Sequence, residues 1–135
     1  MPLKDGTTED YQAAAIRHFQ DASALMEAGR LDNAGHLIGF SAECAIKYRI
    51  DSLGSGVSSP AQHLPEILAA ARKRLGGRAN YASMFNLLKG DAFADWAVDH
   101  RYSVTGKVTQ VQFDAWFTVT KRLLAAANVR VRSGT

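Results

Sequence analysis

Glu43 and Lys47 are the residues whose type and spacing most directly suggest chemistry. They are four positions apart with the acid first, the order that favours an ion pair along one face of a helix. Two interpretations remain open: a salt bridge at a surface or interface, or a polar cleft in which Glu43 pairs with Arg101. An ionised carboxylate in such a cleft needs a nearby cation, because an unpaired buried charge is costly.

Arg101 and its neighbours His100 and Tyr102 form the second candidate group. The planar guanidinium group of Arg101, with its several N–H donors, could bind a phosphate or a substrate. Alternatively, it could have a structural role and bind Glu43 or a helix end. His100 has a stronger claim to catalysis than His36 or His63, because it adjoins Arg101. We expect His63 to make a local hydrogen bond at the start of a helix.

Several familiar sites are missing from the sequence. There is no H-E-x-x-H, no pair of cysteines and no dense carboxylate cluster, so neither a metal nor another cofactor is predicted. Gly76 and Gly77 lack the lysine and hydroxyl of a phosphate-binding loop. The single cysteine, Cys44, is expected to pack rather than to act as a nucleophile.

The element that must position Glu43 and Lys47 is a helix expected from Leu31 to Leu53. Its first face is apolar or small, whereas its second stripe is narrower and mixed. Gly35 and Gly39 are expected to let another backbone come close. The first face comprises Ala34, Leu37, Ile38, Ser41, Ala42, Ala45, Tyr48 and Leu53, and the second stripe comprises His36, Phe40, Glu43 and Lys47.

Helices are also expected at about 8–28, 64–75, 81–88 and 110–128, with another turn or two near Phe93 and Trp96. Thr7 with Asp10, Asp32, and Thr109 with Gln112 have the residue types of N-terminal caps, and Gly29 is a natural stop. Trp96, Trp116 and Phe117 could stack on bases, but their helical spacing favours the core. The sequence therefore predicts one all-α domain over 1–135, with a core at about 8–128, folded as an antiparallel up-and-down bundle of four to five helices.

Composition and charge narrow the class of protein. The chain has 135 residues, is 47% hydrophobic and carries a net charge of +3. No apolar run approaches the roughly 18 residues of a membrane span, and the N-terminus lacks the apolar region of a signal peptide. With one cysteine, a cytoplasmic setting and no membrane contact are expected. From Arg101 onward, six Lys and Arg residues stand against Asp114 alone, which favours a nucleic acid or nucleotide partner.

Three segments together resemble one family. The run AGHLIGFSAECAIKYRI is similar to the second helix of HEPN domains, with matching positions at Ala34, Leu37, Gly39, Glu43, Ile46 and Lys47. His63-Leu64 resembles the start of the third helix of that family. The stretch 96–102, WAVDHRY, resembles the aromatic and Arg-Tyr segment before its final helix. The resemblance spans about residues 10–128.

The resemblance implies a helical bundle that commonly dimerises, here partly through the second and final helices. Many HEPN domains are ribonucleases or relics of ribonucleases in toxin–antitoxin and defence systems, others accompany a small nucleotidyltransferase, and some bind nucleotides. The nuclease members carry R-x(4–6)-H near the start of the last helix. Here no histidine follows Arg101, and His100 precedes it.

These observations give three alternative functions. The first is a homodimeric RNA- or nucleotide-binding protein with a cleft of Glu43, Lys47, His100, Arg101 and Tyr102. There Arg101 would bind phosphate, Glu43 would position it, and Tyr102 would stack or donate. The second is a non-catalytic module that docks onto a small nucleotidyltransferase. The third is a weak metal-independent ribonuclease with His100 and Arg101 as its catalytic residues.

Overall fold

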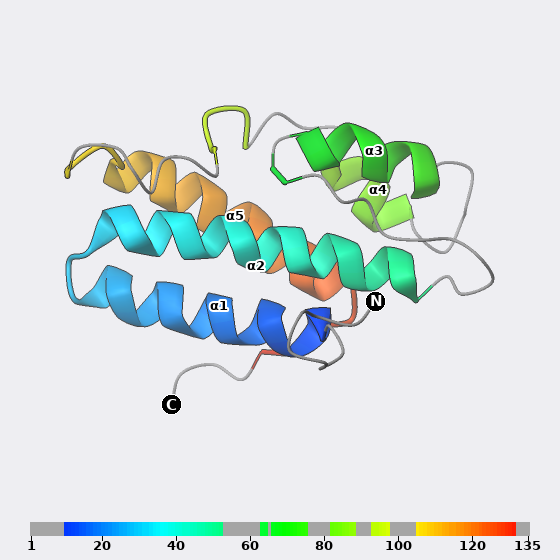
Figure 1. Cartoon of the computed structure of the whole chain (residues 1–135), viewed down its shortest axis with the longest axis horizontal. Coiled ribbons are helices and arrows are strands. Elements are labelled where there is room, and N and C mark those ends of the chain that lie inside the picture. Colours follow the sequence, from blue (N-terminus) through cyan, green and yellow to red (C-terminus); the bar gives the residue numbers. More distant parts are fainter. Residues whose placement is uncertain are drawn as a thin grey trace, which may run out of the picture.

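The computed structural model describes residues 10–52, 63–64, 66–75, 82–88, 93–97 and 105–131. This part of the chain is helical and contains no strand. Its elements are α1 (Tyr11–Glu27), α2 (Leu31–Asp51), α3 (Glu66–Leu75), α4 (Ala82–Leu88) and α5 (Gln110–Ala126) (Figure 1). The expected all-helical bundle is confirmed in the described residues. Every expected helix is present, and its ends lie within a few residues of those predicted.

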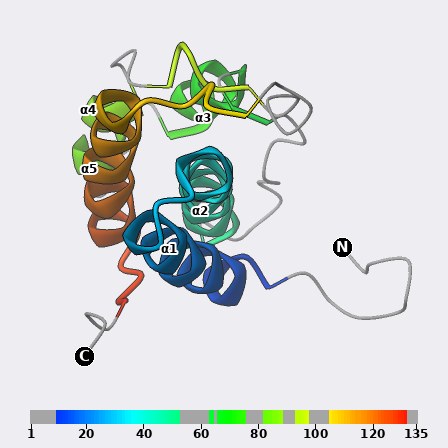
Figure 2. The ribbon, with the colours of Figure 1, turned by 90° about the vertical axis from the view of Figure 1, so that its left-hand side faces the viewer.

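The second helix, α2, is the centre of the bundle. Seen from one end, it has α1, α3 and α5 on three of its sides (Figure 2). Accordingly, it is buried on more than one side, including part of the stripe that the sequence assigned to a separate face. Its buried residues are Ala34, Gly35, Ile38, Gly39, Ser41, Ala42, Glu43, Ala45, Ile46, Lys47 and Ile50.

Hydroxyl groups connect α2 to both long neighbours. Ser41 Oγ donates to the Ala15 carbonyl of α1 at 2.7 Å. Thr120 Oγ1 of α5 donates to the Ile38 carbonyl at 3.5 Å, which is at the limit for a hydrogen bond. Both hydroxyls are buried. They therefore have partners inside the core, where an unsatisfied polar group would be destabilising.

The ends of α1 and α5 follow their local sequence. Asp10 is itself the N-cap of α1 and accepts from the Ala13 N–H at 2.9 Å. The sequence placed Asp10 one turn into a helix capped by Thr7, which lies outside the described residues. Gly29 follows α1 with φ +77°, a left-handed conformation that glycine adopts readily. Thr109 and Gln112 form the expected capping box, each side chain bonding the backbone N–H of the other.

Asp32 does not cap α2, contrary to expectation. Arg30 occupies the N-cap position without a side-chain bond, and Asp32 lies in the first turn of the helix. The Asp32 carboxylate instead accepts from the backbone N–H groups of Gly106 at 2.7 Å and Val108 at 3.0 Å. These backbone bonds lower its pKa below the usual value. Asp32 therefore joins the start of α2 to the segment leading into α5.

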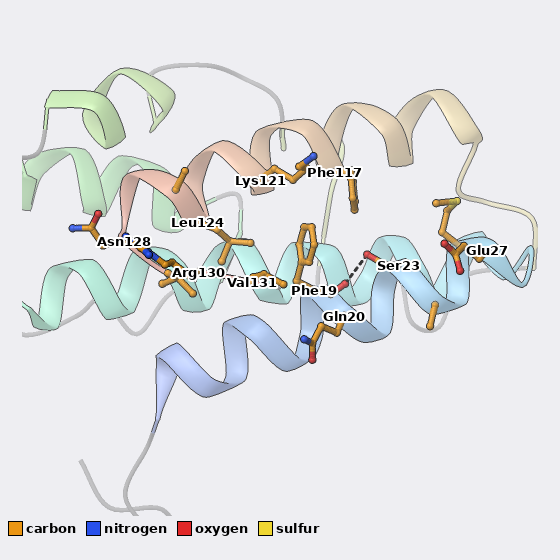
Figure 3. Close-up of a pocket in the computed structure, with 14 residues that line it drawn as sticks. Phe19, Gln20, Ser23, Glu27, Phe117, Lys121, Leu124, Asn128, Arg130 and Val131 are labelled. Carbon is orange, nitrogen blue, oxygen red and sulfur yellow. Dashed lines mark hydrogen bonds between the residues drawn. The ribbon is translucent and has the colours of Figure 1, made fainter. Parts of the chain in front are cut away.

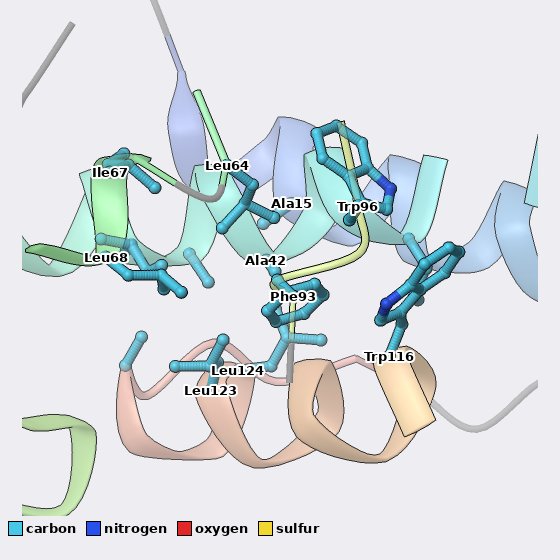
Figure 4. Close-up of a cluster of buried hydrophobic side chains, with 14 of the residues drawn as sticks. Ala15, Ala42, Leu64, Ile67, Leu68, Phe93, Trp96, Trp116, Leu123 and Leu124 are labelled. Atoms are coloured by element: carbon cyan, nitrogen blue, oxygen red, sulfur yellow. The ribbon is translucent and has the colours of Figure 1, made fainter. Parts of the chain in front are cut away.

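Large aromatic rings fill the core between α2 and α5 (Figure 4). Trp96 and Trp116 are each only 1% exposed, so they are core residues rather than base-stacking platforms, as their spacing predicted. Phe117 is half-buried and packs against the core cluster.

Gly35 and Gly39 admit rings, not a neighbouring backbone as expected. A β-carbon at position 39 would overlap the Trp96 indole, and one at position 35 would lie 2.8 Å from a ring carbon of Trp116. The Trp96 N–H donates to the Gly35 carbonyl at 2.8 Å. The two glycines therefore make room for the tryptophans of the core.

Among the described residues, no helix combines the length and apolar composition that crossing a bilayer requires.

Candidate functional site

The buried carboxylate of Glu43 is the centre of the candidate site. Glu43 is 4% exposed and Lys47 is 9% exposed, so both are buried within the bundle. The expected ion pair forms, with Lys47 Nζ 3.3 Å from Glu43 Oε2. The Leu64 backbone N–H also donates to Glu43 Oε1 at 3.2 Å. Glu43 thus fixes the chain just before α3 as well as balancing Lys47.

His63 is the third partner of Glu43. Its Nδ1 lies 3.0 Å from each carboxylate oxygen, across 20 positions of sequence. Its backbone carbonyl also accepts from the Ile67 N–H at 2.8 Å, so the expected local bond near the helix start is made by the main chain. The His63 side chain is 51% exposed, although the carboxylate that holds it is buried.

The pairing has a consequence for the protonation of His63. Glu43 accepts from Lys47 and from the Leu64 N–H, and an ionised carboxylate can only accept hydrogen bonds. Nδ1 therefore carries the proton that it shares with Glu43. In the neutral ring this leaves the lone pair on Nε2, the nitrogen that can accept a proton from a ligand.

Phe40 lies on α2 one turn before Glu43 and is surrounded by rings. Its ring centroid is 4.7 Å from that of His36, 5.9 Å from that of His18 and 6.4 Å from that of His63. Phe40 itself is half-buried. Burial first, and then the positive charge of Arg17, lower the pKa of His18.

Lys47 also contacts α1. Its ammonium lies 5.7 Å from the centroid of the Tyr11 ring, a distance suited to a cation–π interaction. Glu43 and Lys47 together carry no net charge. A proton on His63 would make the three side chains net positive, and this group would then attract an anion such as phosphate.

The residues predicted from sequence separate into two groups. Glu43 and Lys47 are brought together as expected, and His63 is added to them. His100, Arg101 and Tyr102 lie outside the described residues. Sequence analysis missed the Glu43–His63 contact, although it expected a cation near Glu43 and noted His63 at the helix start. Taken together, the expected cation near Glu43 and the position of His63 at a helix start could have indicated this contact.

Other chemistry can be judged from the described side chains. Burial, followed by the charge of Glu43, raises the pKa of Cys44 to about 12, so its thiol is poorly suited to act as a nucleophile. No group of three or more His, Cys, Asp or Glu residues in the described segments could hold a metal ion.

A groove of about 960 Å³ runs between α1 and α5 (Figure 3). Phe19 of α1 stacks on Phe117 of α5 with ring centroids 5.0 Å apart, within the lining. Glu27 contributes a negative charge on the α1 side, whereas Lys121 and Arg130 contribute positive charges on the α5 side. The two walls therefore differ in the sign of their charge.

Comparison of the chain with protein-family models, with curated proteins and with solved structures gives no match. The likeness to HEPN domains therefore rests on the sequence motifs.

Proposed function

We propose that this chain is a HEPN-like RNA- or nucleotide-binding protein of the bacterial toxin–antitoxin or defence type, cytoplasmic and folded as an antiparallel bundle. The observation that carries this proposal is the half-exposed His63 ring, held by buried Glu43 beside the half-buried Phe40. An aromatic ring and a protonatable imidazole are suitable partners for a base and a phosphate.

The burial of Glu43 and Lys47 supports a division of roles among the site residues. Glu43 and Lys47 are too buried to contact a ligand directly, so they position His63 and balance its charge. His63 and Phe40 provide the contacts on this side. We propose that Arg101 holds a phosphate and that Tyr102 stacks or donates, because their residue types suit those tasks.

The experiment is binding of fluorescently labelled single-stranded RNA, and separately of ATP, to the purified chain. We expect Arg101→Ala to weaken RNA binding about 10-fold or more and to reduce its dependence on salt, because one phosphate contact is lost. Phe40→Leu should weaken binding with less effect on salt dependence. Thr118→Ala, at an exposed position of α5, is the control. Absence of RNA and ATP binding by a folded parent would refute the proposal.

We also propose a homodimer. Because α2 has neighbouring helices on three sides and many buried residues, α5 is the better placed of the two helices that sequence analysis expected at the interface (Figure 2). The groove between α1 and α5 has a mixed lining that includes the stacked rings of Phe19 and Phe117, and its walls carry opposite charges. A two-fold axis can bring the negative wall of one copy against the positive wall of the other, which makes such a surface self-complementary.

A second function is a non-catalytic module that docks onto a small nucleotidyltransferase. The observation that favours it is the satisfied state of Glu43, whose oxygens already bond Lys47, His63 and Leu64. In this alternative, Glu43 fixes the start of α3 and contacts no ligand. In this case the complex with the nucleotidyltransferase should survive both Arg101→Ala and His63→Gln, and RNA should not bind.

A further inference from the structure

We infer that the groove between α1 and α5 binds an anionic amphiphile, an unbranched apolar chain that ends in a single carboxylate. This site goes beyond the proposed function, because neither Glu43, His63 nor Phe40 belongs to its lining. The groove is also the surface that we propose for the dimer. A bound amphiphile and a second copy of the chain would therefore compete for it.

The groove has the size of a site for a small molecule. Its volume of about 960 Å³ is at the upper end of the roughly 300–1,000 Å³ that such sites occupy. One wall is α1, and the other is α5 with the residues that follow it as far as Val131 (Figure 3). The lining part of α1, residues 19–27, is about 12 Å long at a rise of 1.5 Å per residue. An extended chain can therefore lie along the walls.

The fold leaves part of the apolar lining in contact with water. Phe19, Met26, Phe117 and Val131 pack against the core cluster, but each of them is only half-buried. Phe19 and Phe117 stack with ring centroids 5.0 Å apart, so they join the two walls. A hydrocarbon chain laid over these side chains would remove apolar surface from water, which is favourable in proportion to the area covered.

The charges of the groove favour one negative charge on the ligand. The charged residues of its described lining are Glu27, Lys121 and Arg130, two positive and one negative, so the lining has a net charge of +1. Lys121 Nζ lies 5.7 Å from the centroid of the Phe117 ring, beside the apolar side chains. Figure 3 shows Glu27 and Arg130 toward opposite ends of the groove, with Phe19 between them. A carboxylate near Lys121 and Arg130 would thus have its chain over the ring pair, away from the repulsion of Glu27.

The test is isothermal titration calorimetry of decanoate with the purified chain, below the concentration at which decanoate forms micelles. We expect saturable binding of one molecule per chain, with a dissociation constant of about 1 mM or lower. From octanoate to dodecanoate, each added methylene should tighten binding about twofold to fourfold. Decylammonium has the same chain with a positive charge, so it should bind more weakly than decanoate.

Variants of the lining locate the ligand. Lys121→Gln and Arg130→Gln should each weaken decanoate binding about twofold to fivefold, because a single exposed ion pair contributes little. Ala24→Trp puts a large ring at an exposed lining position of α1 and should weaken binding about 10-fold or more. Ala115→Trp makes the same change at an exposed position of α5 outside the lining and should bind like the parent. Circular dichroism shows whether each variant is folded.

The competition with the dimer gives a second measurement. Decanoate and a second copy would cover the same side chains, so decanoate should shift the proposed dimer toward monomer in light scattering. Decylammonium at the same concentration is the control and should have less effect. A dimer that keeps its mass while decanoate fills one site per chain would contradict a shared groove.

The outcomes separate this inference from the proposed function. Absence of saturable decanoate binding by the folded chain would overturn the inference and leave RNA binding untouched. Equal binding by the parent and a folded Ala24→Trp would also overturn it, as would uptake of many molecules by all variants alike or binding only to phosphatidylglycerol vesicles. One-to-one binding that Ala24→Trp and Lys121→Gln weaken and Ala115→Trp does not would establish the site, whether or not the chain binds RNA.

Discussion

The Trp96 indole N–H donates a 2.8 Å hydrogen bond to the Gly35 carbonyl, 61 positions earlier in the chain. The same ring lies against Gly39, one turn further along α2, where a β-carbon would overlap it. The short segment 93–97 is therefore held on α2 by a polar bond at one glycine and by close packing at the other. This relationship leads to the first prediction.

Gly39→Ala should destabilise the protein, because the new methyl group displaces the buried Trp96 ring. We expect the free energy of unfolding to fall by about 1–3 kcal/mol, as in other overpacked cores. Chemical denaturation with tryptophan fluorescence measures both the loss and the changed environment of the ring. Gly29→Ala is the control, since it strains a backbone of φ +77° but meets no atom within 4 Å. Equal fluorescence changes in the two variants would contradict the packing argument.

Asp32→Asn should weaken the connection between α2 and the segment before α5. We expect a loss of about 1 kcal/mol at neutral pH, because two charge-assisted hydrogen bonds become neutral ones. The folded pKa of Asp32 lies below its ordinary value of 3.8, so its contribution is complete above that value and is lost as pH falls through the folded value. Denaturation curves of parent and variant should converge only in strong acid. Asp21→Asn, at an exposed position of α1, should leave stability nearly unchanged at all pH values.

Cys44 should resist alkylation in the folded protein. With a pKa of about 12, its thiol is almost wholly protonated at neutral pH, and the thiolate is the reactive form. We expect iodoacetamide to label it at least about 100-fold more slowly than in denaturant, as measured by mass spectrometry. The labelling rate should rise with pH well above the range in which an ordinary cysteine reacts. Rapid labelling of the native protein near pH 7.5 would show that the thiol is not held in this environment.

The proposed dimer predicts a charge-reversal effect. Lys121→Glu reverses a charge on the α5 wall of the groove and should shift the protein from dimer to monomer in light scattering after size exclusion. Glu27→Lys should have a similar effect, and the two changes combined should restore the dimer, because each wall then meets its opposite again. A monomeric parent, or a double variant that stays monomeric while each single variant dissociates, would argue against this surface.

Helix existence and most helix ends could be predicted from sequence because their causes are local. The Thr109–Gln112 capping box and the Asp10 bond to Ala13 each span three positions, and Gly29 needs only its own backbone freedom. Such signals lie within a single helical turn. The sequence therefore contains them without reference to the rest of the fold.

The contacts that sequence analysis missed join residues far apart in the chain. Asp32 is of a residue type that is common at the N-cap of a helix, but its hydrogen-bond partners are 74 and 76 positions away. Gly39 was read correctly as a site of close approach, yet the approaching group is the ring of Trp96 rather than a backbone. Glu43 was expected to need a cation, but only the path of the chain determines that His63 is one of its partners. In each case the residue type indicated the kind of partner: a hydrogen-bond donor, a closely packed group or a cation. The tertiary structure determines which group of the chain occupies that position.

The contacts of Gly39 and Glu43 also constrain the chain between them and their partners. These two residues are one turn apart on α2, about 6 Å along the axis. One holds Trp96 and the other holds His63. The segment from His63 to Trp96 therefore leaves α2 and returns to it within a single turn, and both of its ends are fixed by the same rigid element. Insertions or deletions between α3 and α4 would consequently change the length of this segment without moving His63 or Trp96. Related chains could therefore differ in length there and still keep the contact between Glu43 and His63.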